Sequence, residues 1–268
     1  MVSTTNRLPL ARPRRRRQLG RRFQTAGPGT YIFLIVVAAA SAFPLYWSFV
    51  VASHDNAAVS EYPPVLTPGG QLWHNIGRLF NSGEVSVDFW AALTNSFIVA
   101  LTVSVAVVFF SALAGFAFAK LEFRGSRMLL LAVVATMLVP VQLGVIPLYI
   151  EMKEFGWTNS LQAVTAPYLV TAFGVFRHVV WPAVRPVAAV LGLLTFMTTW
   201  NDFFWPLIVL SPQNPTVQVA VSSLASGYVE DFALVLTGTF ISILPLLFVF
   251  LVLGRQIIGG IMQGAVKG

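Results

Sequence analysis

The sequence predicts an all-α, polytopic membrane protein that crosses the bilayer six times. Of its 268 residues, 56% are hydrophobic and only 10% are charged, whereas a soluble domain carries about 25% charged residues. Its arginines are concentrated in the N-terminal tail, directly before a long apolar stretch, as in proteins that keep basic segments in the cytoplasm. Because a soluble protein needs polar cover on its surface, we infer that lipid is the solvent for most of this chain.

Apolar segments of membrane-spanning length divide the chain into its predicted elements. A spanning helix needs about 20 mostly apolar residues, and four segments meet that length easily. A fifth contains one acidic residue, Asp202, and a sixth has 16 residues, which would reach about 24 Å of a hydrocarbon core of about 30 Å. We predict a basic cytoplasmic tail at 1–29 and a transmembrane domain at 30–268, with spans at 31–52, 91–119, 128–150, 161–176 (the short one), 187–210 and 232–254.

The distribution of positive charge predicts the orientation of these spans. With the N-terminus inside, fifteen of the seventeen Lys and Arg residues fall on the cytoplasmic side, which is the pattern of the positive-inside rule. Both termini are therefore expected in the cytoplasm. The alternative for the first span is a cleaved signal peptide ending near Ala42. The apolar run continues to Ala52, long enough to cross the bilayer, and this favours a retained helix.

Several functional classes lack the residues that they would need. The sequence has no cysteine, and His54, His74 and His178 show no metal-ligand spacing. There is no Gly-rich phosphate loop ending in Lys-Ser or Lys-Thr, and no Ser-His-acid arrangement suited to an intramembrane hydrolase. The basic residues adjoin an apolar run, which indicates contact with anionic lipid and argues against nucleic-acid binding. We expect no metal, no cofactor and no enzymatic activity in this chain.

Polar residues inside the predicted fifth span are the main candidates for a substrate pathway. Asn201 and Asp202 lie between Trp200 and Trp205, and an ionisable residue within a span indicates function. Sugars are bound by planar hydrogen-bonding side chains together with aromatic faces, so this segment offers both. A structural or gating role for Asp202 near an interfacial aromatic belt stays open. Two weaker pathway candidates lie in other spans, Gln142 and Asn95.

A secondary transporter coupled to an ion gradient is the main alternative function. Such transporters use several intramembrane acids or interrupted helices repeated in two halves. Here one acid lies within the spans, and no convincing internal repeat is present. The sequence therefore favours a transporter driven by another energy source.

Several motifs in order resemble the maltose-type permease subunits of carbohydrate ABC importers, from about residue 30 to the end of the chain. The resemblance predicts an ABC importer permease fold for the whole transmembrane domain. The segments that carry it are Thr94–Phe97, Phe116–Gly125, Met137–Pro140 with Ile146–Tyr149, Thr195–Phe196 with Trp200–Leu207, and Gln263–Gly268.

The resemblance implies a pathway with several partners in a bacterial plasma (inner) membrane. An external sugar-binding protein would deliver the sugar, an oligosaccharide, to this chain and a second permease subunit. A cytoplasmic ATPase dimer would bind ATP and Mg²⁺ and drive alternating access, which fits a chain with no nucleotide site of its own. Contact with membrane lipid is expected as well.

One departure from the family falls between the fourth and fifth spans. Relatives carry there a cytoplasmic loop with Glu-Ala-Ala and a downstream glycine, which docks into the ATPase. Here that signature is absent, and the short fourth span ends at the same place. Two explanations stay open: a true deletion, or a segment that the natural protein has and this sequence lacks. The residues that flank the expected ATPase-coupling region are Phe176, Arg177, His178, Trp181, Pro182 and Arg185.

Overall fold

The computed structural model of the chain contains helices and no strands among the residues that it describes, which are 27–59, 62–81, 83–120, 125–136, 138, 140–169, 181–226 and 231–265. The chain divides into two compact units, Met1–Phe43 and Pro44–Gly268. The described part of the first unit is the N-terminal part of helix α1 (Pro28–Ala52), where apolar side chains such as Phe33 and Ile35 are about two-thirds exposed (65% and 67%). This exposure fits a helix whose solvent is lipid.

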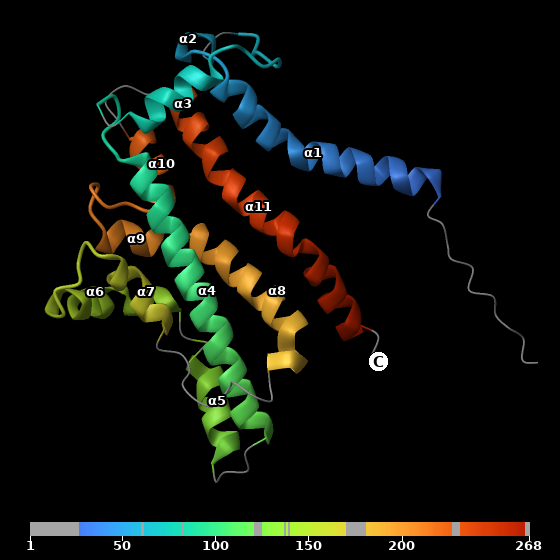
Figure 1. Ribbon diagram of the computed structural model, residues 1–268, viewed down its shortest axis with the longest axis vertical. Helices are drawn as coiled ribbons and strands as arrows, with labels where there is room; N and C mark the ends of the chain where they lie inside the picture. The colour runs from blue at the N-terminus through green and yellow to red at the C-terminus, as the bar shows by residue number, and fades with distance from the viewer. Residues whose placement is uncertain are drawn as a thin grey trace, which may run out of the picture. The chain divides into compact units, whose positions relative to one another are not determined.

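Three long helices organise the second unit (Figure 1). Helices α4 (Phe89–Lys120), α8 (Trp181–Trp200) and α11 (Phe232–Ala265) contact one another in the pairs α4–α8 and α8–α11. Gly192 of α8 faces α4 so closely that an added Cβ would lie 3.2 Å from Val108, which is how small residues let membrane helices approach. The shorter helices are α2 (Asn56–Val59), α3 (Leu72–Phe80), α5 (Ser126–Thr136), η1 (Val141–Gly144), α6 (Val145–Glu154), α7 (Leu161–Leu169), α9 (Phe204–Val209) and α10 (Val217–Ala225).

Within the described residues, three helices are long and apolar enough to cross a membrane. They are Pro28–Ala52, Phe89–Leu113 and Phe232–Gly254, and they agree with the first, second and sixth predicted spans. The fourth predicted span begins as α7 at Leu161, but its residues 170–176 lie outside the described part of the chain. The full count of six spans stays a prediction.

The third and fifth predicted spans are interrupted rather than continuous helices. Residues 128–150 are divided between α5, η1 and α6, with Pro140 directly before η1. Residues 187–210 are divided between α8 and α9, and Pro206 lies in the first turn of α9. Proline has no backbone N–H and therefore ends a helix that precedes it, but it fits the first turn of a new one. Pro140 and Pro206 thus lie beside complete breaks, whereas Pro44, Pro167 and Pro245 lie inside continuous helices.

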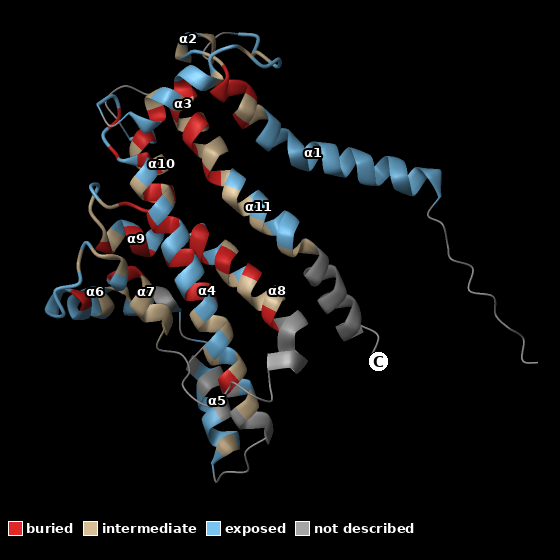
Figure 2. Cartoon of the chain, viewed as in Figure 1, coloured by how far each residue is buried: buried red, intermediate tan, exposed pale blue. Residues whose placement is uncertain are grey.

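The buried apolar side chains form two separate clusters, and α4 contributes to both. The first cluster joins α3, α4, α8, α10 and α11, and the second joins α4, α6, α7 and α9. In Figure 2, buried residues gather toward the Phe89 end of α4 and the Trp200 end of α8. Apolar residues farther along α4 and α11, such as Val105 (62% exposed) and Phe248 (67% exposed), face outward, as expected for lipid contact.

An ion-pair bridge connects the segment before α4 to the start of α11. Arg78 Nη2 lies 2.8 Å from Asp231 Oδ2, and Arg78 Nε lies 3.2 Å from Glu84 Oε2. The hydrogen bond from Arg78 to Asp231, followed by the attraction of both carboxylates, raises the pKa of the guanidinium although partial burial lowers it. Asp231 Oδ1 also accepts from the backbone N–H of Leu234, so it caps the first turn of α11.

Candidate functional site

The break between α8 and α9 is the centre of the candidate site. Residues Asn201–Phe203 are not helical, and they follow directly from Trp200, the last residue of α8. The hydroxyl of Tyr168, in α7, donates a hydrogen bond of 2.7 Å to Asp202 Oδ2. The partly buried carboxylate of Asp202 is thereby held to a neighbouring helix, which offsets part of the cost of removing it from water.

The two tryptophans that flank the break are buried and anchor it on opposite sides. Trp200 is 2% exposed, stacks on Phe196 at 5.7 Å between ring centroids, and donates its indole N–H to the Ser242 carbonyl of α11. Trp205 is 7% exposed and donates its indole N–H to the Ala163 carbonyl of α7. Both rings thus pack inside the protein, where they position the break; neither presents a face outward, as the expected contact with a sugar requires.

Trp200 and Trp205 belong to different hydrophobic clusters. Trp200 is a member of the first cluster, which α11 and α10 share, and Trp205 is a member of the second, which α6 and α7 share. The polar residues Asn201 and Asp202 therefore lie on a short connection between two packed groups of helices.

Asn201 is the exposed polar residue of the break. Its amide nitrogen donates to the Met197 carbonyl at 2.8 Å, and its Oδ1 accepts from Gln218 Nε2 of α10 at 3.3 Å. Asn201 and Gln218, called the amide pair below, thus bring α8 and α10 together at a surface. Of the predicted pathway residues, Asn201 is the one whose side chain is open to a ligand, as far as the described residues go.

Asn95, in α4, is buried and bonded to residues outside the break. It is 9% exposed, and its amide nitrogen donates to Asn214 Oδ1 at 2.7 Å and to the Pro215 carbonyl at 3.0 Å. Asn214 in turn donates to the Asn159 carbonyl, and Asn159 Oδ1 accepts from the backbone and hydroxyl of Ser211. The structure thus makes Asn95 part of an asparagine network that ties α4 to the loops before α7 and after α9.

The remaining predicted residues are described in part. Gln142 lies in η1, but its side chain is outside the described residues, and so are Phe176, Arg177 and His178 in full. Trp181, Pro182 and Arg185 form the first turns of α8, where the backbone alone is described. The backbone of these three residues lies at the end of α8 opposite to the break that follows Trp200.

Sequence reasoning missed three polar partners of the site: Tyr168, Gln218 and Asn159. Tyr168 is 34 positions from Asp202, and Gln218 is 17 positions from Asn201, so no local pattern relates them. One signal was available for Asn159, because asparagine is enriched at positive φ and this residue has a φ of 61°. The helices bring these residues to the break, and helix packing was not readable from the sequence.

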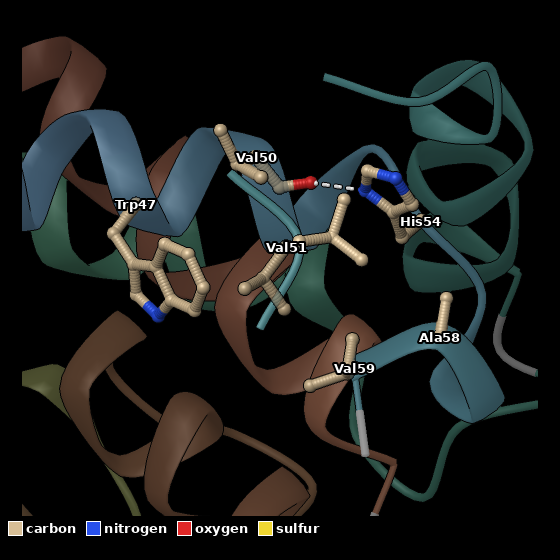
Figure 3. Close-up of a pocket in the computed structure, with 7 residues that line it drawn as sticks. Trp47, Val50, Val51, His54, Ala58 and Val59 are labelled. Carbon is tan, nitrogen blue, oxygen red and sulfur yellow. Dashed lines mark hydrogen bonds between the residues drawn. The ribbon is translucent and has the colours of Figure 1, made fainter. Parts of the chain in front are cut away.

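Two other features of the described residues carry no such chemistry. They contain no group of three or more His, Cys, Asp or Glu side chains able to hold a metal ion. A small cavity beside the end of α1 is mostly aliphatic, and His54 Nδ1 lies 2.9 Å from the Val50 carbonyl there (Figure 3). None of the predicted pathway residues lines that cavity, whose lining is Trp47, Val50, Val51, His54, Ala58, Val59 and Val65.

The fold and the site define a helical membrane protein whose polar residues are gathered at a helix break. A solved chain with the same fold belongs to a bacterial ABC transporter involved in the import of the acidic polysaccharide alginate. The TM-score is 0.67, with 18% identity, and the match covers 85% of this chain and 94% of that one. This likeness shows that the chain has the fold of an ABC importer permease.

Curated relatives are similar to this chain over most of its length. The lactose transport system permease protein LacG of Rhizobium radiobacter is 29% identical, over 88% of this chain and 95% of the relative. The arabinooligosaccharides permease protein AraQ of Bacillus subtilis is 27% identical, over 76% and 82%. The sn-glycerol-3-phosphate permease protein UgpE of Pectobacterium atrosepticum is 26% identical, over 87% and 95%. No family model matches the chain. Its homologues are permeases of sugar ABC transporters, which confirms the resemblance.

These alignments also show that the relatives carry residues without a counterpart here. The alignment with LacG runs over 266 residues but takes in only 88% of the 268 residues of this chain. The alignment with UgpE runs over 267 residues and takes in 87%. Gaps in this chain account for the difference, so it is internally shorter than these relatives.

Proposed function

We propose that this chain is a membrane-spanning subunit of an ATP-driven importer that translocates a sugar by alternating access. The observation that carries the proposal is its homology to sugar ABC permeases over most of both chains. The relatives give no support to the alternative of an ion-coupled transporter. As a transport subunit it performs no chemical reaction itself, and ATP and Mg²⁺ would bind to the ATPase partner.

The complex that this function requires has parts on both sides of the membrane. An external binding protein would present the sugar, and a cytoplasmic ATPase dimer would supply the free energy of ATP hydrolysis. We further propose a second permease subunit, contact with membrane lipid, an oligosaccharide as cargo, and cytoplasmic positions for both termini. Fifteen of seventeen basic residues on one side of the predicted spans support this orientation.

Asn201 and Asp202 are the proposed pathway residues within this chain, with Trp200 and Trp205 holding the break that carries them. Non-helical backbone at membrane depth is stable only where protein buries it or water lines it, and Asn201 is exposed. Asn95 and Gln142 are weaker candidates, since Asn95 is already bonded within the asparagine network.

Transport into vesicles tests this function directly. The full complex, reconstituted with its binding protein, should take up a neutral oligosaccharide only when ATP is present on the ATPase side. Collapse of proton and sodium gradients should leave this uptake unchanged. Uptake that stops with the gradients while ATP remains would establish the ion-coupled alternative instead.

We make a separate proposal about assembly from the Glu-Ala-Ala coupling loop, which this sequence lacks. The gaps of this chain in its alignments with LacG and UgpE support the loss of an internal segment. We propose that this segment is lost at the junction of Phe176 and Arg177. If the loss is real, the subunit should assemble poorly or fail to couple ATP hydrolysis to transport. An intact mass of 29.2 kDa supports a true deletion, and a mass a few kilodaltons higher supports a missing segment. ATP hydrolysis stimulated by loaded binding protein, with this chain at 29.2 kDa, would contradict the proposed defect.

A further inference from the structure

The amide pair at the break is exposed and uncharged. Asn201 is exposed, and Gln218, in the first turn of α10, is partly exposed. Gln218 Nε2 donates a hydrogen bond to Asn201 Oδ1. Among the described residues, none donates a hydrogen bond to Gln218 Oε1. Thr198 lies one turn before Asn201 on α8 and is also exposed. Two amides and a hydroxyl are therefore accessible where α8 ends and α10 begins.

Lipid is an unsuitable neighbour for this group. Asn201 lies in non-helical backbone within the predicted fifth span. At membrane depth, such backbone is tolerated only inside protein or beside water. An amide that faces hydrocarbon without a hydrogen-bond partner is strongly unfavourable. The amide pair therefore faces water or a polar ligand, and amide groups bind hydroxyl groups by donating and accepting at once.

The segments that carry and flank the break contain a carboxylate but no cation. Two neighbouring helices do carry cations: Arg78 of α3, which is paired with Asp231 and Glu84, and the exposed Lys153 of α6. The sequence has no Lys or Arg from Pro186 to Gly254, a stretch that includes α9, α10 and the spanning part of α11. It has none from Phe155 to Phe176 or from Leu79 to Ala119 either. Asp202, adjacent to Asn201, is held by Tyr168. An anionic solute beside the amide pair would thus meet a like charge and no compensating cation from these segments.

We propose that the amide pair, together with Asp202, the next residue along the chain after Asn201, forms a subsite that accepts uncharged sugars and disfavours anionic solutes. The proposal rests on the proposed transport function and narrows its substrate class. Relatives do not decide this point, since at similar identity they are named for lactose, for arabinooligosaccharides and for glycerol-3-phosphate. The distinguishing feature is the repulsion between Asp202 and an anion, which is strong where the effective dielectric constant is low.

Cysteine chemistry tests this electrostatic claim without knowledge of the natural sugar. The chain has no cysteine, so Gln218→Cys places one reactive thiol at the subsite of the assembled complex. We measure how fast this thiol reacts with two methanethiosulfonates, one bearing a sulfonate and one a trimethylammonium group. The ratio of the two rates is compared with the same ratio for Ser86→Cys, in the exposed segment that is predicted to be external. At position 218 the ratio of the cationic to the anionic rate should be about threefold or more higher than at position 86. The substitution Asp202→Asn should remove this preference for the cationic reagent. Tyr168→Phe, which keeps the carboxylate, should retain it.

Each other outcome of the thiol experiment overturns the proposal. A thiol at position 218 that reacts with neither reagent would show that the amide pair does not face water. A preference equal to that of Ser86→Cys, or unchanged by Asp202→Asn, would show that Asp202 does not select by charge. These results are independent of transport, so they are distinguishable from failure of the proposed function.

Competition for uptake links the subsite to substrate class. In the reconstituted complex, a tenfold excess of sn-glycerol-3-phosphate should leave ATP-dependent uptake of a neutral oligosaccharide unchanged, whereas excess unlabelled sugar should abolish it. Asn201→Ala and Gln218→Ala should each reduce uptake about tenfold, as expected for lost hydrogen bonds worth about 1.4 kcal/mol. ATP-dependent uptake of an anion in preference to every neutral sugar would overturn the neutral assignment but leave the importer function intact.

Discussion

The hydroxyl of Tyr168 and the carboxylate of Asp202 are joined by a 2.7 Å hydrogen bond across 34 positions of sequence. This bond ties α7 to the break between α8 and α9. Trp205, in α9, adds a second bond to α7 through the carbonyl of Ala163. The break is thus fixed on one side to α7, while Trp200 fixes its other side to α11.

Removal of the Tyr168 hydroxyl should weaken the attachment of the break. Tyr168→Phe leaves the ring in place but deprives Asp202 of its donor, at an expected cost of about 1 kcal/mol. The thermal midpoint of the purified complex should fall accordingly. Tyr149→Phe is the matched control, because Tyr149 is exposed at 37% and its substitution should change little. Equal midpoints for Tyr168→Phe and the parent would contradict the role of the bond.

The two buried tryptophans should contribute to stability independently. Trp200→Phe and Trp205→Phe each remove an indole donor and leave space in a packed cluster, at an expected cost of about 2 kcal/mol each. Since the two residues belong to different clusters, the double variant should lose the sum within about 0.5 kcal/mol. Denaturant or thermal unfolding of the four proteins measures this.

Trp73→Phe is the control for the tryptophan pair, because Trp73 is 79% exposed. Its effect should stay within about 0.5 kcal/mol. A coupling energy between Trp200 and Trp205 well above that value would show that the two clusters behave as one unit.

The bridge from Arg78 to Asp231 should stabilise the start of α11 weakly and in a salt-dependent way. Both side chains keep some exposure, 29% for Arg78 and 19% for Asp231, so a cost near 1 kcal/mol or less is expected for Arg78→Gln. The raised pKa of Arg78 keeps it charged throughout the working pH range. The difference in midpoint between the parent and Arg78→Gln should shrink between low and high salt. A difference in midpoint that does not change with salt concentration would argue against an electrostatic bridge.

The absence of cysteine allows the orientation to be measured with single thiols. Ser86→Cys, in the predicted external segment, should react with a membrane-impermeant maleimide on intact cells. Ser126→Cys, in the predicted cytoplasmic segment between the second and third spans, should react only after permeabilisation. The reverse pattern would overturn the cytoplasmic assignment of both termini, which rests on the distribution of basic residues.

The sequence determined the membrane class and three helices long and apolar enough to span a bilayer. It also singled out residues 200–206, where the structure has a helix break. Hydropathy and charge are local properties, so residues 31–52, 91–119 and 232–254 could be predicted within a few residues of α1, α4 and the apolar part of α11. The motifs that resemble carbohydrate permeases added a resemblance that the homologous permeases confirmed. Asn201 and Asp202 could be selected because polar residues in an apolar span are rare.

Tertiary structure alone decided how those residues are used. Pro140 and Pro206 are visible in the sequence, but whether a helix breaks at a proline depends on partners that replace the lost hydrogen bonds. Trp200 and Trp205 looked alike in sequence, yet packing buries them in different clusters. Tyr168 and Gln218 reach the break only because α7 and α10 are packed against their neighbours, and hydrogen bonds between distant residues leave no local pattern to read.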